Sequence, residues 1–517
     1  MAASLWLSWQ NQVSLSASDD EAVVAAPGTR IVLRPLRPEI SAAMKRLAPP
    51  GEDEERLAES ILSAGTVDSL ARWYYHIDHL RRRGLIRRSL HGEGRPLATL
   101  CPFECPPSPS STVARNGVSR RQLCATNGKA GHGRPETGAS RYVLSRFAYM
   151  RREADELIVE SPLAHARVIL HDSRLMSLLG ELASPKTTDE LVQRQDGSLH
   201  GLAAGDVAAL LSLLHEANMI ELLTAGENCL DENCLGGEAD SQAAGTLEAW
   251  EFHDLLFHSR SRKGRSKGRF GATYRFGHAS PPPALKTPVE RPGYELYRPD
   301  MKRLEKSDPS LAAVQERRCS LREYAAQPIT ARQLGEFLYR VARVKKQWQS
   351  QASSVEGGPP LEFASRPFPA GGALYELDFY IAVRACQDIA CGLYHYDPLR
   401  HRLGRLAEMT PEVGSLLSDA AMSAGIDCES LQVLVILASR FGRIAWKYES
   451  MAYALTLKNV GVVYQTMYLA ATAMNLAPCA LGCGDSDLFA RATGTDYHVE
   501  TSVGEFLLGS KLSHVFT

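Results

Sequence analysis

A lysine and a tyrosine stand side by side in "RIAWKYES", residues 443–450, shortly after the apolar and β-prone run "LQVLVILASRF". The unperturbed pKa values of both side chains are about 10. A neighbouring ammonium favours tyrosinate, and burial lowers a lysine pKa. Lys447 and Tyr448 near a buried strand end can therefore act as a coupled acid/base unit. The ordinary alternative is a solvated lysine beside a packing tyrosine.

A second candidate site lies in "RRCSLREY", residues 317–324. Arg318, Ser320 and Arg322 alternate along this stretch, so an extended backbone points all three to one side. Two guanidiniums and a hydroxyl together suit a phosphate. Alternating arginines are also common on ordinary protein surfaces.

Two glycine-containing loops complete the set of candidates. In "RPFPAGGALYELDFYIAV", Pro369, Ala370, Gly371 and Gly372 allow the backbone to approach a flat ligand, or simply form a tight turn into a strand. In "CALGCGDSD", residues 479–487, the glycines can present backbone N–H groups to a ring. In "GEFLLGSKL", Gly509, Ser510 and Lys511 can supply a last phosphate contact.

The elements that must position these groups lie in residues 300–517, where the texture is α/β. A helix capped by Thr330 is predicted over 330–347, and strands are predicted over 376–384 and 431–440. A long helix over 455–477 is apolar almost all round. Such a helix is buried, either in a core or in a dimer interface.

The N-terminal part reads as two winged-helix modules. In 56–90, apolar residues at three- and four-residue spacing predict a helix that ends at Gly84, and a β-prone wing follows. The second copy, 141–223, opens with strands that turn at "READE". Helices are predicted over 166–183, over 187–195 and in the stretch 205–223.

The surface chemistry of these modules favours peptide over DNA. "HLRRRGLIRR" is basic, but the last helix of the second module is nearly uncharged, and the net charge of the chain is −1. We therefore expect a peptide bound along a wing or strand edge, and no nucleic-acid partner. The low-complexity stretches 106–140 and 224–247 are linkers, 258–271 is a basic run, and 278–299 is a proline-rich extended connector.

Composition sets the remaining bounds. Apolar content of 44% and charged content of 23% are ordinary for globular proteins, no apolar run predicts a membrane span, and the N-terminus lacks the features of a secretory signal. The eleven cysteines suit reduced thiols in a cytoplasmic protein. Three close cysteine pairs lack zinc-knuckle spacing, so no metal is expected: Cys101/Cys105, Cys229/Cys234 and Cys479/Cys483.

The order of the motifs resembles the nitroreductase superfamily. R-x-S-x-R-x-[FY], P-x-x-G-A-L-Y, G-L-Y-H-Y-D-P at 392–398, K-Y, a long Ala-rich helix and a glycine loop follow one another over about 300–517. Within the superfamily, the chain resembles the SagB-type azoline dehydrogenases, the thiazole- and oxazole-forming oxidases of ribosomal peptide natural products. The segment 248–265 and the winged modules extend this resemblance more weakly over most of the chain.

The resemblance implies roles for individual residues. It implies that Arg318, Ser320 and Arg322 form the first FMN-binding segment, and that 369–372 contacts the flavin across a dimer interface. It places Leu481 and Gly482 near the isoalloxazine ring and makes Lys511 the terminal phosphate contact. The loop usually carries Ser where this chain has Ala370, so more of the binding falls on backbone groups. Lys447 and Tyr448 match the Lys-Tyr pair regarded as catalytic.

We therefore expect an α+β chain with tandem winged-helix modules before a nitroreductase-like FMN fold with a central mixed sheet. Its expected function is FMN-dependent oxidation of peptide thiazolines or oxazolines to azoles, which removes two electrons and two protons. The expected partners are a precursor peptide, a second copy of the chain and a cyclodehydratase, with no membrane. The alternatives are a superfamily reaction on a small molecule, or a flavin-free scaffold. The predicted domains are 1–105, a linker 106–140, 141–223, a linker 224–300, and 301–517.

Overall fold

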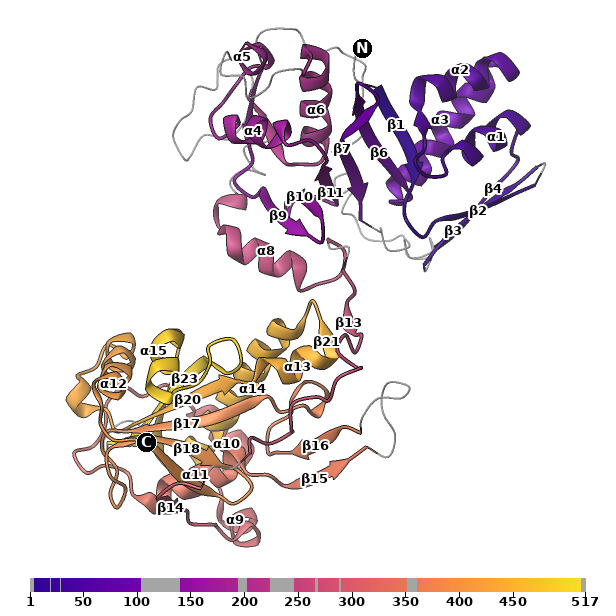
Figure 1. The fold of residues 1–517 in the computed structure, drawn as a ribbon. Coiled ribbons are helices and arrows are strands. Elements are labelled where there is room, and N and C mark those ends of the chain that lie inside the picture. Colours follow the sequence, from indigo (N-terminus) through magenta and orange to yellow (C-terminus); the bar gives the residue numbers. More distant parts are fainter. Residues whose placement is uncertain are drawn as a thin grey trace. The chain divides into compact units, whose positions relative to one another are not determined.

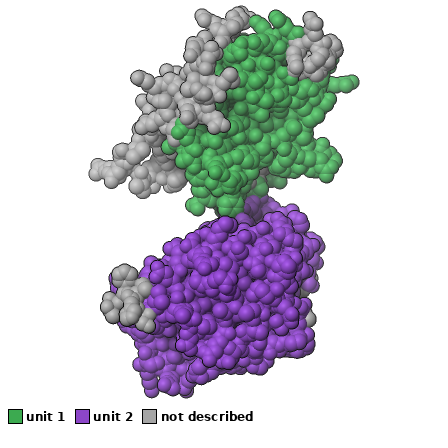
Figure 2. Space-filling model, turned by 90° about the vertical axis from the view of Figure 1, so that its left-hand side faces the viewer, with its two compact units in different colours: residues 1–268 green, residues 269–517 purple. Residues whose placement is uncertain are grey.

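The computed structural model describes residues 4–18, 20–27, 29–103, 140–193, 202–223, 246–265, 268–287, 290–350 and 360–512. The chain forms two compact units, residues 1–268 and 269–517, which Figure 2 colours separately. Each unit has its own sheet and its own hydrophobic core. Among the described residues, no helix is both long and apolar enough to span a bilayer.

The first unit is organised by one seven-stranded sheet that runs through both winged-helix modules (Figure 1). The modules join where β7 pairs antiparallel with β11, so that Ala98 lies opposite Leu170 and Leu100 opposite Val168. In spatial order the strands are β5 (Glu52–Asp53), β1 (Ser4–Trp9), β6 (Ile86–Gly92), β7 (Arg95–Pro102), β11 (Ala166–Leu170), β10 (Glu156–Glu160) and β9 (Tyr149–Glu153).

The first module agrees with its sequence pattern. Trp73, Ile77 and Leu80 are buried on one face of α3, which ends before Gly84 at a φ of 71°, and β6 begins two residues later. A separate small sheet lies earlier in the chain. The elements are β2 (Ser14–Ala17), β3 (Ala22–Ala26), β4 (Thr29–Leu33), α1 (Pro38–Arg46), α2 (Glu54–Ala64) and α3 (Val67–Arg82).

The second module corrects one helix prediction and shows where the last helix ends. Residues 166–170 form β11 and not the start of a helix, because "ARVIL" is buried along its whole length between β7 and β10. The stretch 205–223 is helical only to Glu216 and ends in β12, which pairs with β8. The elements are β8 (Arg141–Leu144), α4 (Arg174–Glu181), α5 (Thr188–Val192), α6 (Ala204–Glu216), β12 (Ile220–Leu223) and α8 (Phe252–Arg260).

The second unit is a seven-stranded sheet covered on both faces. Helices α11 (Ala331–Ala342) and α14 (Ala452–Ala473) cover one face, and helices α12 (Pro411–Ala424) and α15 (Ser486–Thr493) cover the other (Figure 1). Alternate residues of the strands form one core with each pair of helices. In spatial order the strands are β14 (Gly293–Glu295), β19 (Arg402–Ala407), β18 (Gly392–Asp397), β17 (Leu377–Val383), β20 (Val433–Ser439), β23 (Thr501–Ser510) and β22 (Leu476–Leu481). A mixed sheet was expected, but all these pairings are antiparallel. Each strand runs opposite to the strands beside it.

The predicted helices of this unit are present with shifted ends. The helix predicted over 330–347 stops at Ala342 and is followed by a strand, and the long helix spans 452–473. The remaining elements are α9 (Met301–Ser307), α10 (Leu311–Arg317), α11 (Ala331–Ala342), β15 (Lys346–Gln349), β16 (Glu362–Ser365), η2 (Gly371–Ala373), α12 (Pro411–Ala424), η3 (Cys428–Ser430), α13 (Phe441–Lys447), β21 (Tyr448–Glu449), α14 (Ala452–Ala473) and α15 (Ser486–Thr493).

A strap formed by residues 269–287 packs into the second unit, although its sequence predicts a linker. Its backbone carbonyls accept hydrogen bonds from side chains of α13 and of Arg440, which directly precedes that helix. Arg440 donates to the carbonyls of Pro283 and Ala284, Arg443 to that of Pro282, and the Trp446 indole to that of Ala279. The strap thus supplies acceptors that three buried side chains need.

Candidate functional site

Lys447 and Tyr448 lie where a helix meets a short strand. Lys447 is the last residue of α13, and Tyr448 is the first residue of β21. A strand end was expected here, but the two-turn helix α13 intervenes after β20. The helical conformation allows this segment to bury the side chains of Arg443, Ile444 and Trp446.

The pair meets the glycine loop directly. The Lys447 Nζ lies 5.4 Å from the centre of the Tyr448 ring. Gly372 has a φ of 62°, and a Cβ there would lie 2.7 Å from the Tyr448 hydroxyl and 2.9 Å from the Lys447 Nζ. Both polar ends therefore converge on the backbone of Gly372, where a side chain has no room. Two segments singled out separately in the sequence form one site.

A buried amide holds the glycine loop in place. The Asn459 Oδ1 on α14 accepts a hydrogen bond from the Gly371 N–H at 3.1 Å, and its Nδ2 donates to the Glu376 Oε1 at 2.8 Å. Glu376 is fully buried, and this burial raises its pKa. The sequence analysis missed both residues. The available signal was a polar Asn459 within an almost wholly apolar helix.

Tyr274 of the strap is the second missed neighbour. Its ring centre lies 5.7 Å from the Lys447 Nζ, and its backbone N–H donates to the Lys447 carbonyl at 3.1 Å. Its φ is 52°, a conformation that costs a bulky residue energy and persists only where the surroundings impose it. The adjoining strand β13 (Gly271–Ala272) pairs with β21, so that Ala272 lies opposite Tyr448. The strap therefore forms one wall around the Lys447 ammonium.

The predicted phosphate segment lies beside the C-terminal half of α14. The Arg318 guanidinium is 5.3 Å from the Tyr468 ring, and the Ser320 and Tyr468 hydroxyls are 2.7 Å apart. Burial raises the pKa of the Cys479 thiol, and the neighbouring Arg322 opposes that shift. Lys511 follows β23 and forms a β-bridge with Tyr324. Arg322 thus lies beside the middle of β22, whereas Lys511 lies near the start of this strand and lines a small pocket with Cys319 and Leu321.

The second glycine loop starts where β22 ends. Leu481 is the last residue of this strand, and its carbonyl accepts a hydrogen bond from the Tyr464 hydroxyl at 3.4 Å. A Cβ on Gly482 would meet nothing within 4 Å, so the space beside its backbone is open. Gly484 packs against the Glu505 carboxyl, whose pKa burial raises to about 7.

These groups form two clusters at different levels of α14. Asn459 and Tyr468 are nine residues apart, which is about 13 Å along a helix axis. One cluster holds the Lys447–Tyr448 pair over Gly372, and the other holds Arg318, Ser320 and Arg322. A cationic cradle and glycine backbones without neighbouring side chains fit a cofactor that has a phosphate and a flat ring.

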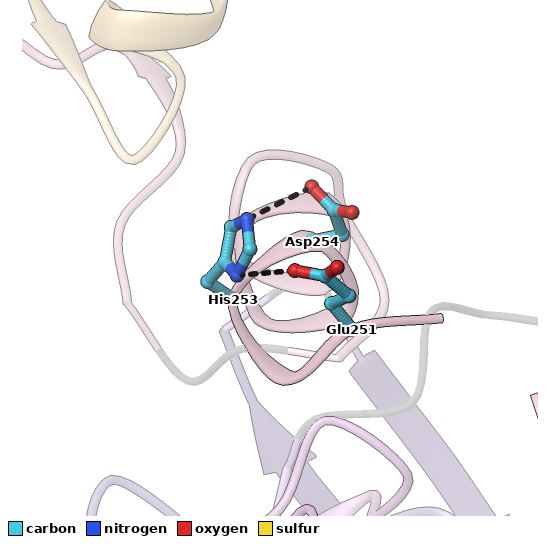
Figure 3. A group of neighbouring side chains, drawn as sticks. All are labelled: Glu251, His253 and Asp254. Carbon is cyan, nitrogen blue, oxygen red and sulfur yellow. Dashed lines mark ion pairs between the residues drawn. The ribbon is translucent and has the colours of Figure 1, made fainter. Parts of the chain in front are cut away.

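Figure 3 shows a separate acidic group on α8 and just before it. The ring nitrogens of His253 lie 3.4 Å from the Glu251 carboxylate and 3.5 Å from the Asp254 carboxylate. All three side chains are exposed. These ion pairs account for the arrangement, so the group gives no reason to infer a metal.

Three protein families match successive parts of the chain. Residues 1–107 match the ThcOx helix-turn-helix domain, residues 142–267 match the cyanobactin oxidase ThcOx, and residues 314–509 match the nitroreductase family. These matches confirm the predicted fold class, the oxidoreductase class and the resemblance to azoline-oxidising members of the superfamily.

Individual relatives match the chain more remotely. MJ1384 of Methanocaldococcus jannaschii, assigned to the nitroreductases, is 28% identical over 188 residues, which are 36% of this chain and 83% of that protein. An Anabaena variabilis structure assigned to the nitroreductases is 15% identical and covers 72% of this chain and 80% of its own, with a TM-score of 0.33. A chain of the E. coli microcin synthetase McbBCD complex with truncated pro-MccB17 bound is 18% identical and covers 44% and 79%, with a TM-score of 0.31.

Proposed function

We propose that this chain oxidises peptide azolines to azoles. It is an oxidoreductase in which a nitroreductase-family domain follows two N-terminal regions of the cyanobactin oxidase type. The observation that carries the proposal is the meeting of Lys447 and Tyr448 over Gly372. It combines two exchangeable protons with a surface that a flat ring can approach. Thiazolines and oxazolines remain equal candidates as substrates.

We assign the cofactor as FMN. Arg318, Ser320, Arg322 and Lys511 would hold its phosphate. The loop Pro369–Gly372 with Ala370 in place of the usual serine, and the loop Leu481–Gly482, would contact its ring through backbone groups. When bound, FMN supplies the acceptor for two electrons.

The chain's own contribution is removal of a proton from the azoline ring. Aromatisation releases a hydride and a proton from neighbouring ring positions, so a base must stand beside the ring as the hydride leaves. The Lys447 amine and the Tyr448 hydroxyl share that task as a coupled pair. Positioned proton transfer of this kind contributes about 10²–10⁴-fold to the rate.

The test of the pair uses Lys447→Ala and Tyr448→Phe. Both proteins are expected to keep a yellow flavin and to lose azole formation by about 10²–10⁴-fold. Mass spectrometry of a heterocyclised peptide measures the outcome as a loss of about two mass units per ring. Wild-type activity in both variants would contradict the assignment. A wild-type protein without flavin absorbance would instead favour a scaffold, and turnover of free nitroarenes with NADPH would favour a small-molecule reductase.

We propose three partners for this reaction. The N-terminal unit binds the precursor peptide along a strand edge, as its exposed edge strand β9 permits. A second copy of the chain packs on α14, which presents Tyr453, Leu457 and Val462 as exposed apolar side chains. A cyclodehydratase supplies the azoline. Light scattering of the purified protein tests the dimer, and replacement of Leu457 by Glu is expected to give monomers.

A further inference from the structure

A cavity of about 470 Å³ opens on the other face of the second unit's sheet. Its floor includes Tyr380, which enters the core shared with α12 and α15. Ala370 and Ala373, which flank Gly371 and Gly372, pack against the opposite core. The cavity is therefore separated by the sheet from the site around Lys447 and Tyr448. Its volume lies within the usual range for small-molecule sites.

The hollow exists because one strand position lacks a side chain. Tyr380 lies opposite His395, and His395 lies opposite Gly404, so the three form one row across β17, β18 and β19. A Cβ built on Gly404 would meet only ordinary contacts at 3.9 Å, one of them the Arg291 Cβ. The space for a ligand thus begins beside Gly404. The backbone conformation at this position does not itself require a glycine.

The floor of the cavity is polar. The Tyr380 hydroxyl donates to Glu500 at 2.6 Å and accepts from Lys286, which also pairs with Glu500 at 2.6 Å. These three groups satisfy one another. Among the described residues, the Nε2 of His395 has no hydrogen-bond partner although it is shielded from solvent. An unpaired buried nitrogen of this kind is expected to have a ligand or an ordered water.

The rim of the cavity is basic. Arg291, Arg400 and Arg402 line it, whereas the acidic lining residues are Glu362 and Asp397. Arg400 and Arg402 pair with Glu290 and Glu295, whose side chains are 77% and 76% exposed. Ion pairs with such exposed carboxylates are weak, so an incoming anion can replace them. Leu285, Leu399 and Leu406 supply apolar walls between rim and floor.

We propose that this cavity binds a phosphate ester of nucleotide size. The phosphate lies between the rim arginines, which suit its geometry, and the organic body fills the hollow over Gly404 toward His395. The site is additional to the azoline-oxidising site and does not depend on it.

Calorimetric titration of the full-length protein, loaded with one equivalent of FMN and freed of excess FMN, tests the proposal with AMP, ribose 5-phosphate and inorganic phosphate as probes. The bound equivalent keeps the probes from the cofactor's own phosphate site, and removal of the excess keeps FMN, which is also a phosphate ester of nucleotide size, out of the cavity. AMP is expected to bind, and inorganic phosphate to bind at least about tenfold more weakly because it leaves the apolar walls unused. Gly404→Leu is expected to abolish binding by filling the hollow. Arg291→Gln is expected to weaken AMP by about tenfold or more.

Arg405→Gln is the matched control. It removes a guanidinium from β19, the strand of Gly404 and Arg402, at a position outside the cavity lining. This variant is expected to bind AMP like the wild type. The proposal is overturned if no probe saturates, if inorganic phosphate binds as well as AMP, or if Gly404→Leu binds AMP unchanged. Should Gly404→Leu fail to fold, equal affinities of the Arg291 and Arg405 variants would overturn it.

Discussion

At the scale of single residues, Asn459 links the glycine loop to the buried Glu376. It is 6% exposed and satisfies a backbone N–H on one side and a carboxyl on the other. Among the described residues, the second Glu376 oxygen already lacks a hydrogen-bond partner, and Asn459 binds the other oxygen. Removing it leaves polar groups unpaired in the core.

Asn459→Ala is therefore expected to lower the free energy of unfolding by about 2–4 kcal/mol in urea titrations. It is also expected to reduce azole formation, since the loop that meets Lys447 and Tyr448 loses its anchor. Thr466→Ala is a control at a half-buried position of the same helix, away from Asn459, where the change is expected to stay within about 0.5 kcal/mol. Equal stability of both variants would show that the amide does not hold the loop.

The buried carboxyl of Glu505 is expected to make the stability of the fold depend on pH. Burial raises its pKa from 4.5 to about 7, so the folded protein keeps this proton at pH values where the unfolded chain has released it. The stability from this group is thus complete below about pH 4.5 and is lost as the pH rises through 7. Glu505→Gln, which stays neutral, is expected to raise the unfolding free energy at pH 8 by on the order of 2 kcal/mol and to change little at pH 4.5.

Thermal unfolding across pH 4.5–8 measures the effect of Glu505→Gln, with Glu316→Gln as the control. Glu316 is exposed on α10, so its replacement is expected to shift stability equally at every pH. A Glu505 variant whose advantage is the same at both ends of the range would contradict the assigned pKa direction.

At the scale of elements, the strap forms a wall of the site through Tyr274. The ring stands beside the Lys447 ammonium and also packs edge-on against Trp446 at 5.6 Å. Because its backbone pairs with the residues of the Lys-Tyr motif, the strap and α13 fix the direction of the lysine side chain together.

Tyr274→Ala is expected to lower the rate of azole formation roughly tenfold, because it removes a cation–π contact with Lys447 and loosens the orientation of this lysine. The flavin content is expected to stay unchanged. Tyr274→Phe keeps the ring and is expected to restore the rate. The pH profile distinguishes positioning from simple destabilisation, because the alanine variant is expected to shift its basic limb. Wild-type rates in Tyr274→Ala would remove the strap from the mechanism.

How far the sequence predicts these elements depends on the range of the interactions. The Lys447–Tyr448 pair and the glycine loop could be found because each is a local motif, and β17 and β20 because their apolar runs are short and β-prone. Residues 166–170 were mistaken for a helix because their strand conformation depends on pairing with β10 and with the distant β7, which the local pattern does not contain. The roles of Tyr274 and Asn459 depend on contacts far along the chain, which no local pattern contains.

At the scale of the whole molecule, the chain consists of two units whose boundary lies at 268/269. The predicted oxidoreductase domain began at 301, which leaves out the strap. Arg443 is completely buried and Arg440 nearly so, and both donate to strap carbonyls. A buried guanidinium without acceptors costs several kcal/mol, a large part of a typical domain's stability.

Residues 269–517 are therefore expected to fold alone and bind flavin, whereas residues 301–517 are expected to aggregate or unfold. Far- and near-ultraviolet circular dichroism and flavin absorbance of the two fragments decide this. A folded, yellow 301–517 fragment would show that the buried arginines find other acceptors.

The 269–517 fragment also separates chemistry from peptide recognition, since it lacks the sheet whose edges are proposed to bind the precursor. It is expected to oxidise a short azoline peptide at a rate near that of the full chain but to lose its preference for the full-length precursor, and an unchanged preference would place precursor binding in the second unit.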